Sequence, residues 1–239
     1  IPGFKEIYLK GKFSRLETLL IYLRKQGKDD VKLWNSIKNT ISKVYQLKEK
    51  NFIAASASFH SSRNFFELVR FDFIIDDNIK AWLLEVNMSP NLSSAAHNHN
   101  KLMYEKVIFN MLTLTGVSRF TRQRRKDSST EELAMRVSNE DIQVNAICGN
   151  KKCLQSCHSE ECELCSLCLE KDEHDFLKVS YLEHVHRRTY RRVYPPPMTQ
   201  ETAKVLSKNS TRLNTLSKPN RLMHTWFMYK CLQDASWCS

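Results

Sequence analysis

The sequence predicts an α+β fold, in which an antiparallel hairpin packed by helices precedes a mainly irregular or helical, cysteine-rich tail. Two apolar segments, residues 66–75 and 81–86, are separated by the polar residues 76–78, which is typical of a β-hairpin. Apolar residues recur at helical spacing on both sides of this hairpin. Six of the eight cysteines then fall between residues 148 and 168. Such a cluster is held by metal ions or disulfides more often than by an apolar core.

The N-terminal part predicts two helices and a strand. Ser14 and Glu17 have the spacing of a capping box, which begins a first helix. Asp30 caps a second helix, whose apolar residues between positions 34 and 45 follow the helical period. The segment from Phe52 to Phe59 is rich in small residues and predicts a strand before the hairpin.

The hairpin predicts a group of oxygen-bearing side chains. If it folds about Asn78-Ile79, Asp72 lies opposite Glu85, and Asn87 shares the face of Glu85 because side chains alternate along a strand. Buried, unpaired carboxylates are costly, so these side chains predict a bound cation. Hard oxygen ligands suit Mg²⁺ that shares its remaining positions with water and phosphate oxygens. The alternative is a turn-capping Asp72, a Glu85 on a solvated edge and an Asn87 that begins a loop.

The second half of the chain is more polar. Residues 101–114 predict a helix that stops at Gly116. A basic run from Arg119 to Lys126 follows, and a second basic segment spans residues 184–192. The first run is explained either as a solvated linker or as a surface that grips an acidic partner. The segment from Thr199 to Leu216 predicts a further amphipathic helix.

Composition excludes several classes of protein. The 239 residues carry a formal net charge of +11, which favours acidic partners. The basic runs contain few aromatic residues, so nucleic-acid binding is disfavoured. No apolar run has the length of a membrane span, and the first residues do not resemble a signal peptide. The chain begins with Ile1, which predicts a fragment or a processed product. Only five widely spaced glycines occur, so a P-loop is excluded.

The cysteine cluster has three explanations, namely Zn²⁺ ligands, disulfides and free buried thiols, of which free thiols suit such close clustering least. The spacing Cys162-x-x-Cys165-x-x-Cys168 is one with which turns present thiolates to Zn²⁺, and His158 and His174 add nitrogen donors. An even number of closely spaced cysteines suits disulfides equally well if this part lies outside the cytosol. The cluster comprises Cys148, Cys153, Cys157, Cys162, Cys165 and Cys168.

The segment FELVRFDF, a two-acid turn and then KAWLLEVNMSPNL resemble the end of the catalytic core of the tubulin tyrosine ligase-like family, which are ATP-grasp amino-acid ligases. The family pattern of Asp, Glu thirteen residues on and Asn two further on matches Asp72, Glu85 and Asn87 without a gap. One departure is Arg70, where the family usually has Gly. Residues 31–117 resemble the last third of the core, so the subdomains that supply the adenine pocket are not in this sequence.

The resemblance implies an ATP-dependent carboxylate–amine ligase, in which ATP phosphorylates a carboxylate and an amine attacks the acyl phosphate. It implies that Asp72 and Glu85 are catalytic and hold Mg²⁺ together with Asn87. Lys80 and Lys101 are the candidate contacts to ATP or substrate. The implied reaction is polyglutamylation, the commoner activity, in which free glutamate is joined to glutamate side chains in acidic tubulin tails. Glycine or tyrosine addition is not distinguished from it.

Such an enzyme works in the cytoplasm, at the cytoskeleton or cilium, and this reducing compartment favours structural Zn²⁺ over disulfides in the tail. The predicted division is residues 1–117 as the C-terminal part of the ligase core, 118–145 as a linker and 146–239 as a basic, cysteine-rich extension. The rival hypothesis is a non-catalytic module on a truncated ligase core that binds microtubules or another acidic protein.

Overall fold

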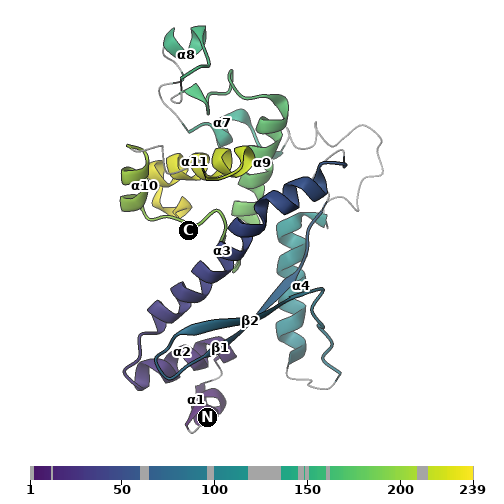
Figure 1. The fold of residues 1–239 in the computed structure, drawn as a ribbon, viewed down its shortest axis with the longest axis vertical. Coiled ribbons are helices and arrows are strands. Elements are labelled where there is room, and N and C mark those ends of the chain that lie inside the picture. Colours follow the sequence, from purple (N-terminus) through teal and green to yellow (C-terminus); the bar gives the residue numbers. More distant parts are fainter. Residues whose placement is uncertain are drawn as a thin grey trace. The chain divides into compact units, whose positions relative to one another are not determined.

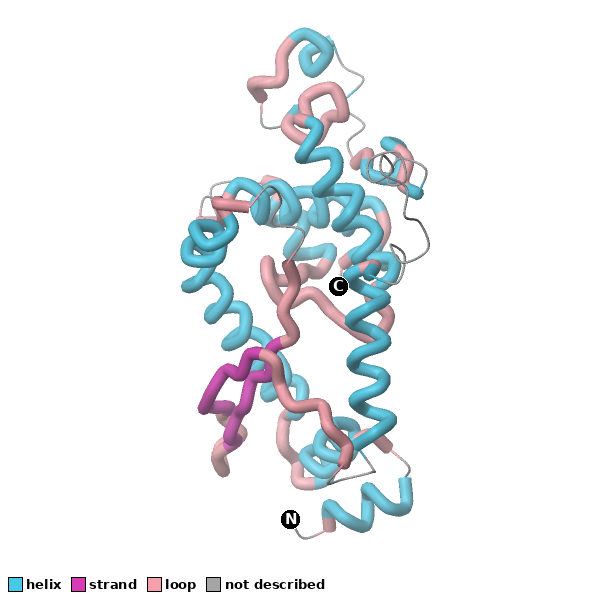
Figure 2. Tube along the Cα trace, turned by 90° about the vertical axis from the view of Figure 1, so that its right-hand side faces the viewer, coloured by secondary structure: helices cyan, strands magenta, loops and turns pink. Residues whose placement is uncertain are grey.

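The computed structural model combines helices with one two-stranded sheet (Figure 1). It describes residues 3–11, 13–59, 65–95, 100–117, 136–144, 148, 151–159, 162–208 and 215–238. The basic run from Arg119 to Lys126 lies outside these residues. In the described part, strand is confined to one hairpin and helix predominates, as Figure 2 shows. This mixture agrees with the predicted α+β class.

The elements follow one another as α1 (Phe4–Gly11), α2 (Arg15–Lys25), α3 (Asp30–Ser56), β1 (Val69–Ile75), β2 (Ala81–Met88), α4 (Lys101–Thr115), α7 (Asn139–Ile142), α8 (Lys151–Gln155), α9 (Lys171–His186), α10 (Gln200–Leu206), α11 (Lys218–Gln233) and the 3₁₀ turn η6 (Ala235–Trp237). Of the helices described, none combines the length and the apolar character that crossing a bilayer requires.

The chain forms two compact units, and the first comprises residues 1–47 and 67–90. Its helix α2 begins at the predicted capping box: the Glu17 N–H donates to Ser14 Oγ (3.2 Å), and the Ser14 N–H donates to the Glu17 carboxylate (2.8 Å). The core of this unit is a small cluster of three buried residues from α2, α3 and β2, namely Leu23, Leu33 and Ala81. Sequence patterning therefore predicted the helices that support the hairpin.

Helix α3 is longer than predicted. It begins at Asp30, as expected, but continues to Ser56, so the prediction of a strand from Phe52 to Phe59 is wrong. Alanines at positions 54 and 55 have the strongest helix preference, and propagation of an existing helix adds a hydrogen bond for each residue. Phe52 is 57% exposed, so this end of the segment is not buried as a strand in a core would be.

The hairpin has the predicted register on one side of a bulge and a different one on the other. Asp72 pairs with Glu85, as predicted. The register then shifts, so that Phe73 pairs with Leu83 and Leu84 is the additional residue in β2. A bulge of this kind adds one unpaired residue to a strand. The predicted facing of Asp72 and Glu85 is therefore confirmed, although the predicted pairing nearer the turn is wrong.

Asp76 organises the turn of the hairpin. Its carboxylate accepts hydrogen bonds from the backbone N–H groups of Asn78 (3.0 Å) and Lys80 (2.9 Å) and from the indole N–H of Trp82 (2.9 Å). Ile79 has a φ of 62°, a left-handed conformation that β-branched residues rarely adopt. These hydrogen bonds hold the turn in a shape that Ile79 alone would not favour.

The second unit comprises residues 48–66 and 91–239 and has a core of its own. At its centre Trp226 of α11 is 0% exposed, and its indole N–H donates to the Ile142 carbonyl (2.7 Å). The core also contains the buried residues Val137, Val144, Leu164, Leu177, Leu222 and Phe227. The tail is thus mainly helical in its described part and packs around an aromatic centre.

Two helices of the second unit bear on the sequence predictions. Helix α4 agrees with the prediction for residues 101–114 and ends at Gly116, whose φ of 72° makes it a left-handed cap. The predicted helix from Thr199 to Leu216 is observed as α10, which ends at Leu206. Residues 209–214 lie outside the described part of the chain.

Glu49, near the C-terminal end of α3, is a buried anchor of the second unit. It is 8% exposed and accepts hydrogen bonds from Tyr194 Oη (3.0 Å), the Ser217 N–H (3.1 Å) and Asn220 Nδ2 (2.6 Å). Ser217 is the N-cap of α11, where a negative charge is favourable. Burial opposes the charged form, but these hydrogen bonds outweigh it and lower the pKa of Glu49.

We expect Glu49→Gln to destabilise the second unit by about 2 kcal/mol. The NH₂ group of the glutamine side chain is itself a donor, so it could not accept the hydrogen bonds that now reach one of the Glu49 carboxylate oxygens. Chemical denaturation followed by tryptophan fluorescence measures this change. Glu201→Gln is the matched control, since Glu201 is exposed in α10 and its replacement should change the free energy by less than about 0.5 kcal/mol. Equal stability of the two variants would contradict the anchoring role.

Candidate functional site

Strand β1 has one face against helices and one face turned away from them. Phe73 packs against the buried cluster of α2 and α3, and the ring of Phe71 lies 6.0 Å from that of Tyr45 on α3. Because side chains alternate along a strand, Arg70 and Asp72 lie on the opposite face. The α3 contact therefore decides which face of the hairpin presents the polar side chains.

Four side chains form a cluster on this outer face, and we call Arg70, Asp72, Glu85 and Asn87 the hairpin cluster. The Arg70 guanidinium donates to both Asp72 oxygens (2.8 and 3.0 Å), and its Nη2 lies 4.0 Å from Glu85 Oε1. Asn87 Nδ2 donates to Glu85 Oε1 (3.0 Å) and to Asp72 Oδ2 (3.4 Å). The hydrogen bonds from Arg70 hold the pKa of Asp72 below its usual value.

The sequence predicted a bound cation because Asp72 and Glu85 were expected to be buried and unpaired, and the structure shows that they are neither. The side chains of Asp72 and Glu85 are 32% and 60% exposed, so these carboxylates are not buried in the described structure. They are also not unpaired, because the positive charge that both approach is the guanidinium of Arg70. Arg70 was noticed in the sequence only as a departure from the family pattern, and its role as their partner was missed.

The donor set of the hairpin cluster nevertheless fits a divalent cation. Two carboxylates face each other in register, and the Asn87 amide stands beside them. Carboxylate and amide oxygens are the ligands that Mg²⁺ takes. No group of three or more His, Cys, Asp or Glu side chains in the described residues is arranged to hold a metal. The ligands of a metal at this site would be Asp72, Glu85 and Asn87. The Arg70 guanidinium would have to move away from the two carboxylates for a metal to bind there.

The loop after β2 is held by a residue that sequence reasoning did not identify. The N–H and the hydroxyl of Ser89 donate to Glu67 Oε1 (2.9 and 3.2 Å). Ser89 has a φ of 48°, so these two hydrogen bonds stabilise a left-handed residue just before Pro90. Val69 of β1 pairs with Met88 of β2, so the residues just before β1 lie opposite the residues just after β2. This pairing could have predicted from the sequence that Glu67 lies near the loop.

The described contacts of the two candidate lysines are with residues outside the hairpin cluster. The ammonium of Lys80 lies 3.5 Å from the ring centre of Trp82, at the turn of the hairpin. Lys101 begins α4 in the second unit and pairs with Glu105 (3.9 Å). Their contacts in the described residues are those of surface cations, and a role in binding ATP stays a prediction.

All eight cysteines are paired in disulfides, so the expectation of structural zinc is wrong. The pairs are Cys148–Cys165, Cys153–Cys162, Cys157–Cys168 and Cys231–Cys238. A sulfur atom in a disulfide is no longer the thiolate that zinc requires. The two candidate histidines also have other partners: His158 hydrogen-bonds Ser156 Oγ (3.0 Å), and His174 hydrogen-bonds the Ser166 carbonyl (2.8 Å).

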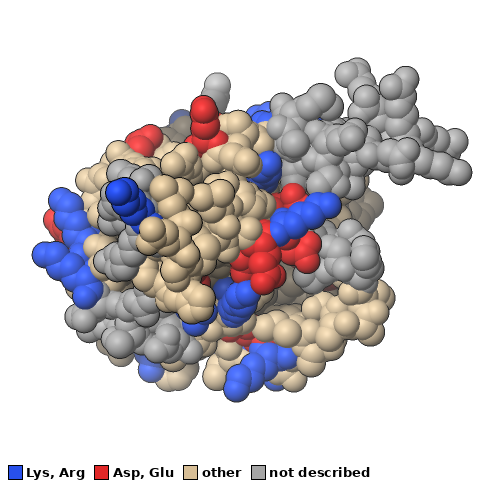
Figure 3. Space-filling model, turned by 90° about the horizontal axis from the view of Figure 1, so that it is seen from above, with Lys and Arg blue, Asp and Glu red and all other residues tan. Residues whose placement is uncertain are grey.

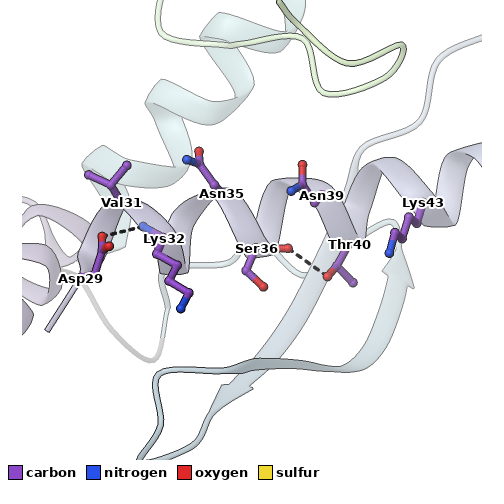
Figure 4. A pocket seen from close by; sticks show the side chains of 8 residues that line it. All are labelled: Asp29, Val31, Lys32, Asn35, Ser36, Asn39, Thr40 and Lys43. Atoms are coloured by element: carbon purple, nitrogen blue, oxygen red, sulfur yellow. Dashed lines mark hydrogen bonds between the residues drawn. The ribbon is translucent and has the colours of Figure 1, made fainter. Parts of the chain in front are cut away.

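A polar hollow of about 630 Å³ lies along α3, and Figure 4 shows its lining side chains. The Asn35 and Asn39 amides point to the same side of the helix, while Thr40 bonds back to the Ser36 carbonyl (3.0 Å). Lys32 and Lys43 add positive charge. The hollow is separate from the hairpin cluster, because none of its lining residues belongs to β1 or β2.

Among the described residues that Figure 3 shows, lysine and arginine side chains are not gathered into one continuous patch. Lysine and arginine side chains stand in separate groups there, with a group of acidic side chains among them. Arg119 to Lys126, which the sequence suggested as a grip on acidic partners, lies outside the described residues. That prediction stays untested.

Comparison with known proteins places the hairpin cluster in a family context. The model of the tubulin-tyrosine ligase family matches residues 5–128, a range that contains α1 to α4 and the hairpin. The chain is 29% identical over its whole length to probable tubulin polyglutamylase ttll-15 of Caenorhabditis elegans, of which it covers 45%. No solved structure matches the chain significantly.

Two mammalian proteins are similar over a shorter part of the chain. Probable tubulin polyglutamylase TTLL2 of Homo sapiens is 31% identical over 52% of this chain and 20% of that protein. Tubulin polyglutamylase TTLL5 of Mus musculus is 35% identical over 42% of this chain and 8% of that protein. The chain thus spans less than half the length of each of these relatives.

Proposed function

This chain belongs to the tubulin-tyrosine ligase family, and from that premise we propose that it is the C-terminal part of an ATP-grasp ligase that adds glutamate to glutamate side chains of tubulin. The observation that carries the proposal is the facing of Asp72 and Glu85 in register, with Asn87 beside them. The names of the relatives, which are tubulin polyglutamylases, support tubulin as substrate and glutamate as the added amino acid.

The proposed reaction forms an amide bond through an acyl phosphate. The γ-phosphate of ATP passes to a carboxylate oxygen of the acceptor and ADP leaves. The amine of free glutamate then attacks the acyl carbon and expels phosphate. Both steps gather negative charge, so charge stabilisation is the main task of the site. Mg²⁺, when bound, supplies that stabilisation at the phosphates.

The residues of this chain have separate tasks in that proposal. Asp72 and Glu85 would supply the carboxylate ligands, and their facing positions set the distance between them. Asn87 donates to Glu85 Oε1 (3.0 Å) and so restrains this carboxylate on the face that it shares with Asp72. Glu67 holds the Ser89 turn through the two hydrogen bonds described above, which limits the freedom of the loop beside the site.

The test of the function is ATP-dependent incorporation of labelled glutamate into tubulin by the full-length protein, with labelled glycine and labelled tyrosine in parallel. Transfer of glutamate alone supports the proposal. Transfer of glycine or tyrosine would change the assigned amino acid, and no transfer of any of the three would contradict the ligase.

One observation favours a second candidate function, a non-catalytic module that binds an acidic protein. The guanidinium of Arg70 already spans the two carboxylates (3.0 and 4.0 Å), and the family usually has glycine there. A cluster neutralised in this way would hold its shape without metal. The same assay separates the two candidates, since a binding module associates with tubulin but transfers no amino acid.

We expect Arg70→Gly to increase the affinity of the hairpin cluster for a divalent cation by about tenfold. Removing one positive charge a few ångströms from a divalent ion in an exposed setting contributes about 1–2 kcal/mol. Binding of Mn²⁺, followed by its electron paramagnetic resonance signal in the full-length protein, measures the change without activity. Arg15→Gln, an exposed cation on α2, is the control. An affinity that Arg70→Gly leaves unchanged would contradict competition between Arg70 and a metal.

If tubulin is the substrate, the proposed location of the protein is the cytoplasm, at the cytoskeleton or the cilium. The four disulfides count against it, because disulfides form and persist in oxidising compartments. The ATP-grasp assignment and the division into residues 1–117, 118–145 and 146–239 also remain proposals. They are supported by the family match over residues 5–128.

A further inference from the structure

A cavity of about 280 Å³ lies within the second unit, to which all its lining residues belong. Three arginines from the end of α9 and the loop after it line this cavity, namely Arg187, Arg191 and Arg192. Apolar side chains of two helices, Leu114 of α4 and Met223 and Phe227 of α11, form part of its wall. A small, partly apolar cavity with a few convergent polar groups is the usual form of a ligand site.

Arg192 is the residue that indicates what the cavity binds. Its guanidinium lies 4.0 Å from the ring centre of Phe227, and its Nε and Nη1 are buried without a hydrogen-bond partner among the described residues. Burial lowers the pKa of Arg192 to about 10. A buried guanidinium with unsatisfied donors is costly, and an oxyanion that accepted them would remove that cost.

The charges around the cavity point the same way. Glu183 is the one carboxylate among the described residues that line it, and burial raises the pKa of Glu183 to about 7. Burial, together with the nearby arginines, lowers the pKa of His184 to about 4, and burial with Arg192 does the same to His224. The pKa values of both histidines thus respond to the positive charge of the arginines around the cavity.

We propose that this arginine cavity is a binding site for a small oxyanion, a phosphate ester or a carboxylate, that carries a compact apolar body. The guanidinium of Arg192 would form paired hydrogen bonds with two oxygens, since its planar donors match both groups. The wall formed by Leu114, Met223 and Phe227 would contact the body of the ligand. The inference does not depend on the ligase activity, because no residue of the hairpin cluster takes part.

The test compares Arg192→Met with Arg188→Met in the full-length protein. Arg188 is exposed, lies over Phe109 (4.8 Å) and does not line the cavity, so it is a matched control. Inorganic phosphate and free glutamate serve as the two probes, and thermal melting with calorimetry measures their binding. Phosphate or glutamate that binds elsewhere, for example at a ligase site, would respond to neither substitution.

We expect one of the probes to raise the melting temperature of the wild-type and Arg188→Met proteins. Arg192→Met should lose at least about tenfold in affinity for that probe, which corresponds to about 1.4 kcal/mol. Without anion, Arg192→Met should melt at or above the wild type, because it removes an uncompensated buried charge.

Two results would overturn the proposal. One is a wild-type protein whose melting temperature neither probe changes at millimolar concentration. The other is an Arg192→Met variant that melts lower than the wild type yet keeps the full response to the anion, since Arg192 would then be structural. The probe whose effect depends on Arg192 identifies the ligand as phosphate-like or carboxylate-like.

Discussion

Replacement of Glu85 by Gln in the full-length protein should reduce ATP-dependent glutamate transfer by about 100-fold or more. The substitution preserves the shape of the side chain but removes the charge through which Glu85 would hold Mg²⁺, and such charge stabilisation matters most in the transition state. The fold should persist, because the Glu85 side chain is 60% exposed and its described contacts are with Asn87 and Arg70.

The measurement is incorporation of labelled glutamate into tubulin, with Mn²⁺ binding and thermal melting recorded for each variant. Asp77→Asn is the matched control, because Asp77 lies in the turn of the same hairpin. The hydrogen bond described for Asp77 is one that its backbone carbonyl accepts from Lys28 Nζ (3.3 Å), so the substitution does not remove the acceptor. Full activity of Glu85→Gln would exclude Glu85 as a catalytic ligand. Loss of activity with unchanged Mn²⁺ binding would assign it a role other than metal binding.

Removal of one disulfide from the cysteine cluster should have the second large effect. Cys153 and Cys162 enclose a short loop with a sequence separation of 9, and closing such a loop contributes about 2–3 kcal/mol. Leu164, between two bridged cysteines, is 4% exposed in the core around Trp226. A double substitution, Cys153→Ser with Cys162→Ser, should therefore loosen this core as well as the cluster.

Denaturant unfolding of the wild-type and doubly substituted proteins, with and without reducing agent, measures this effect through tryptophan fluorescence. The pair Cys231 and Cys238 lies in a different part of the unit and closes a separation of 7. Its replacement by serines is the comparison for a bridge outside the cluster. A cluster variant as stable as the wild type would show that the bridge contributes nothing to the fold.

Alkylation followed by mass spectrometry of protein from its own cells decides the compartment. We expect no free thiol, because each of the eight cysteines has a disulfide partner. Alkylation of all eight cysteines would contradict the disulfides. It would instead favour zinc binding by the cysteine cluster and a cytoplasmic protein. If all eight cysteines are paired, the enzyme would meet its acceptor in an oxidising compartment. The acceptor would then be either another acidic protein of that compartment or tubulin that reaches it.

Short-range patterns determined the hairpin, its supporting helices and the candidate site from the sequence alone. The Ser14 capping box, the left-handed Gly116 and the facing of Asp72 and Glu85 each depend on residues close together in the chain or in one strand pair. Alternation along a strand and capping at a helix end are local rules. For that reason the facing pair could be predicted from local patterns, while the resemblance to the ligase family indicated these residues as candidate metal ligands.

Only the tertiary structure decided what surrounds those ligands and how the tail is held. Which face of the hairpin stays exposed depends on where α3 packs, and the pairing of six clustered cysteines is one of many that their spacing permits. The buried, unsatisfied donors of Arg192 arise because helices remote in sequence enclose them. These features rest on contacts between distant segments, and local patterns carry no information about which distant surfaces meet.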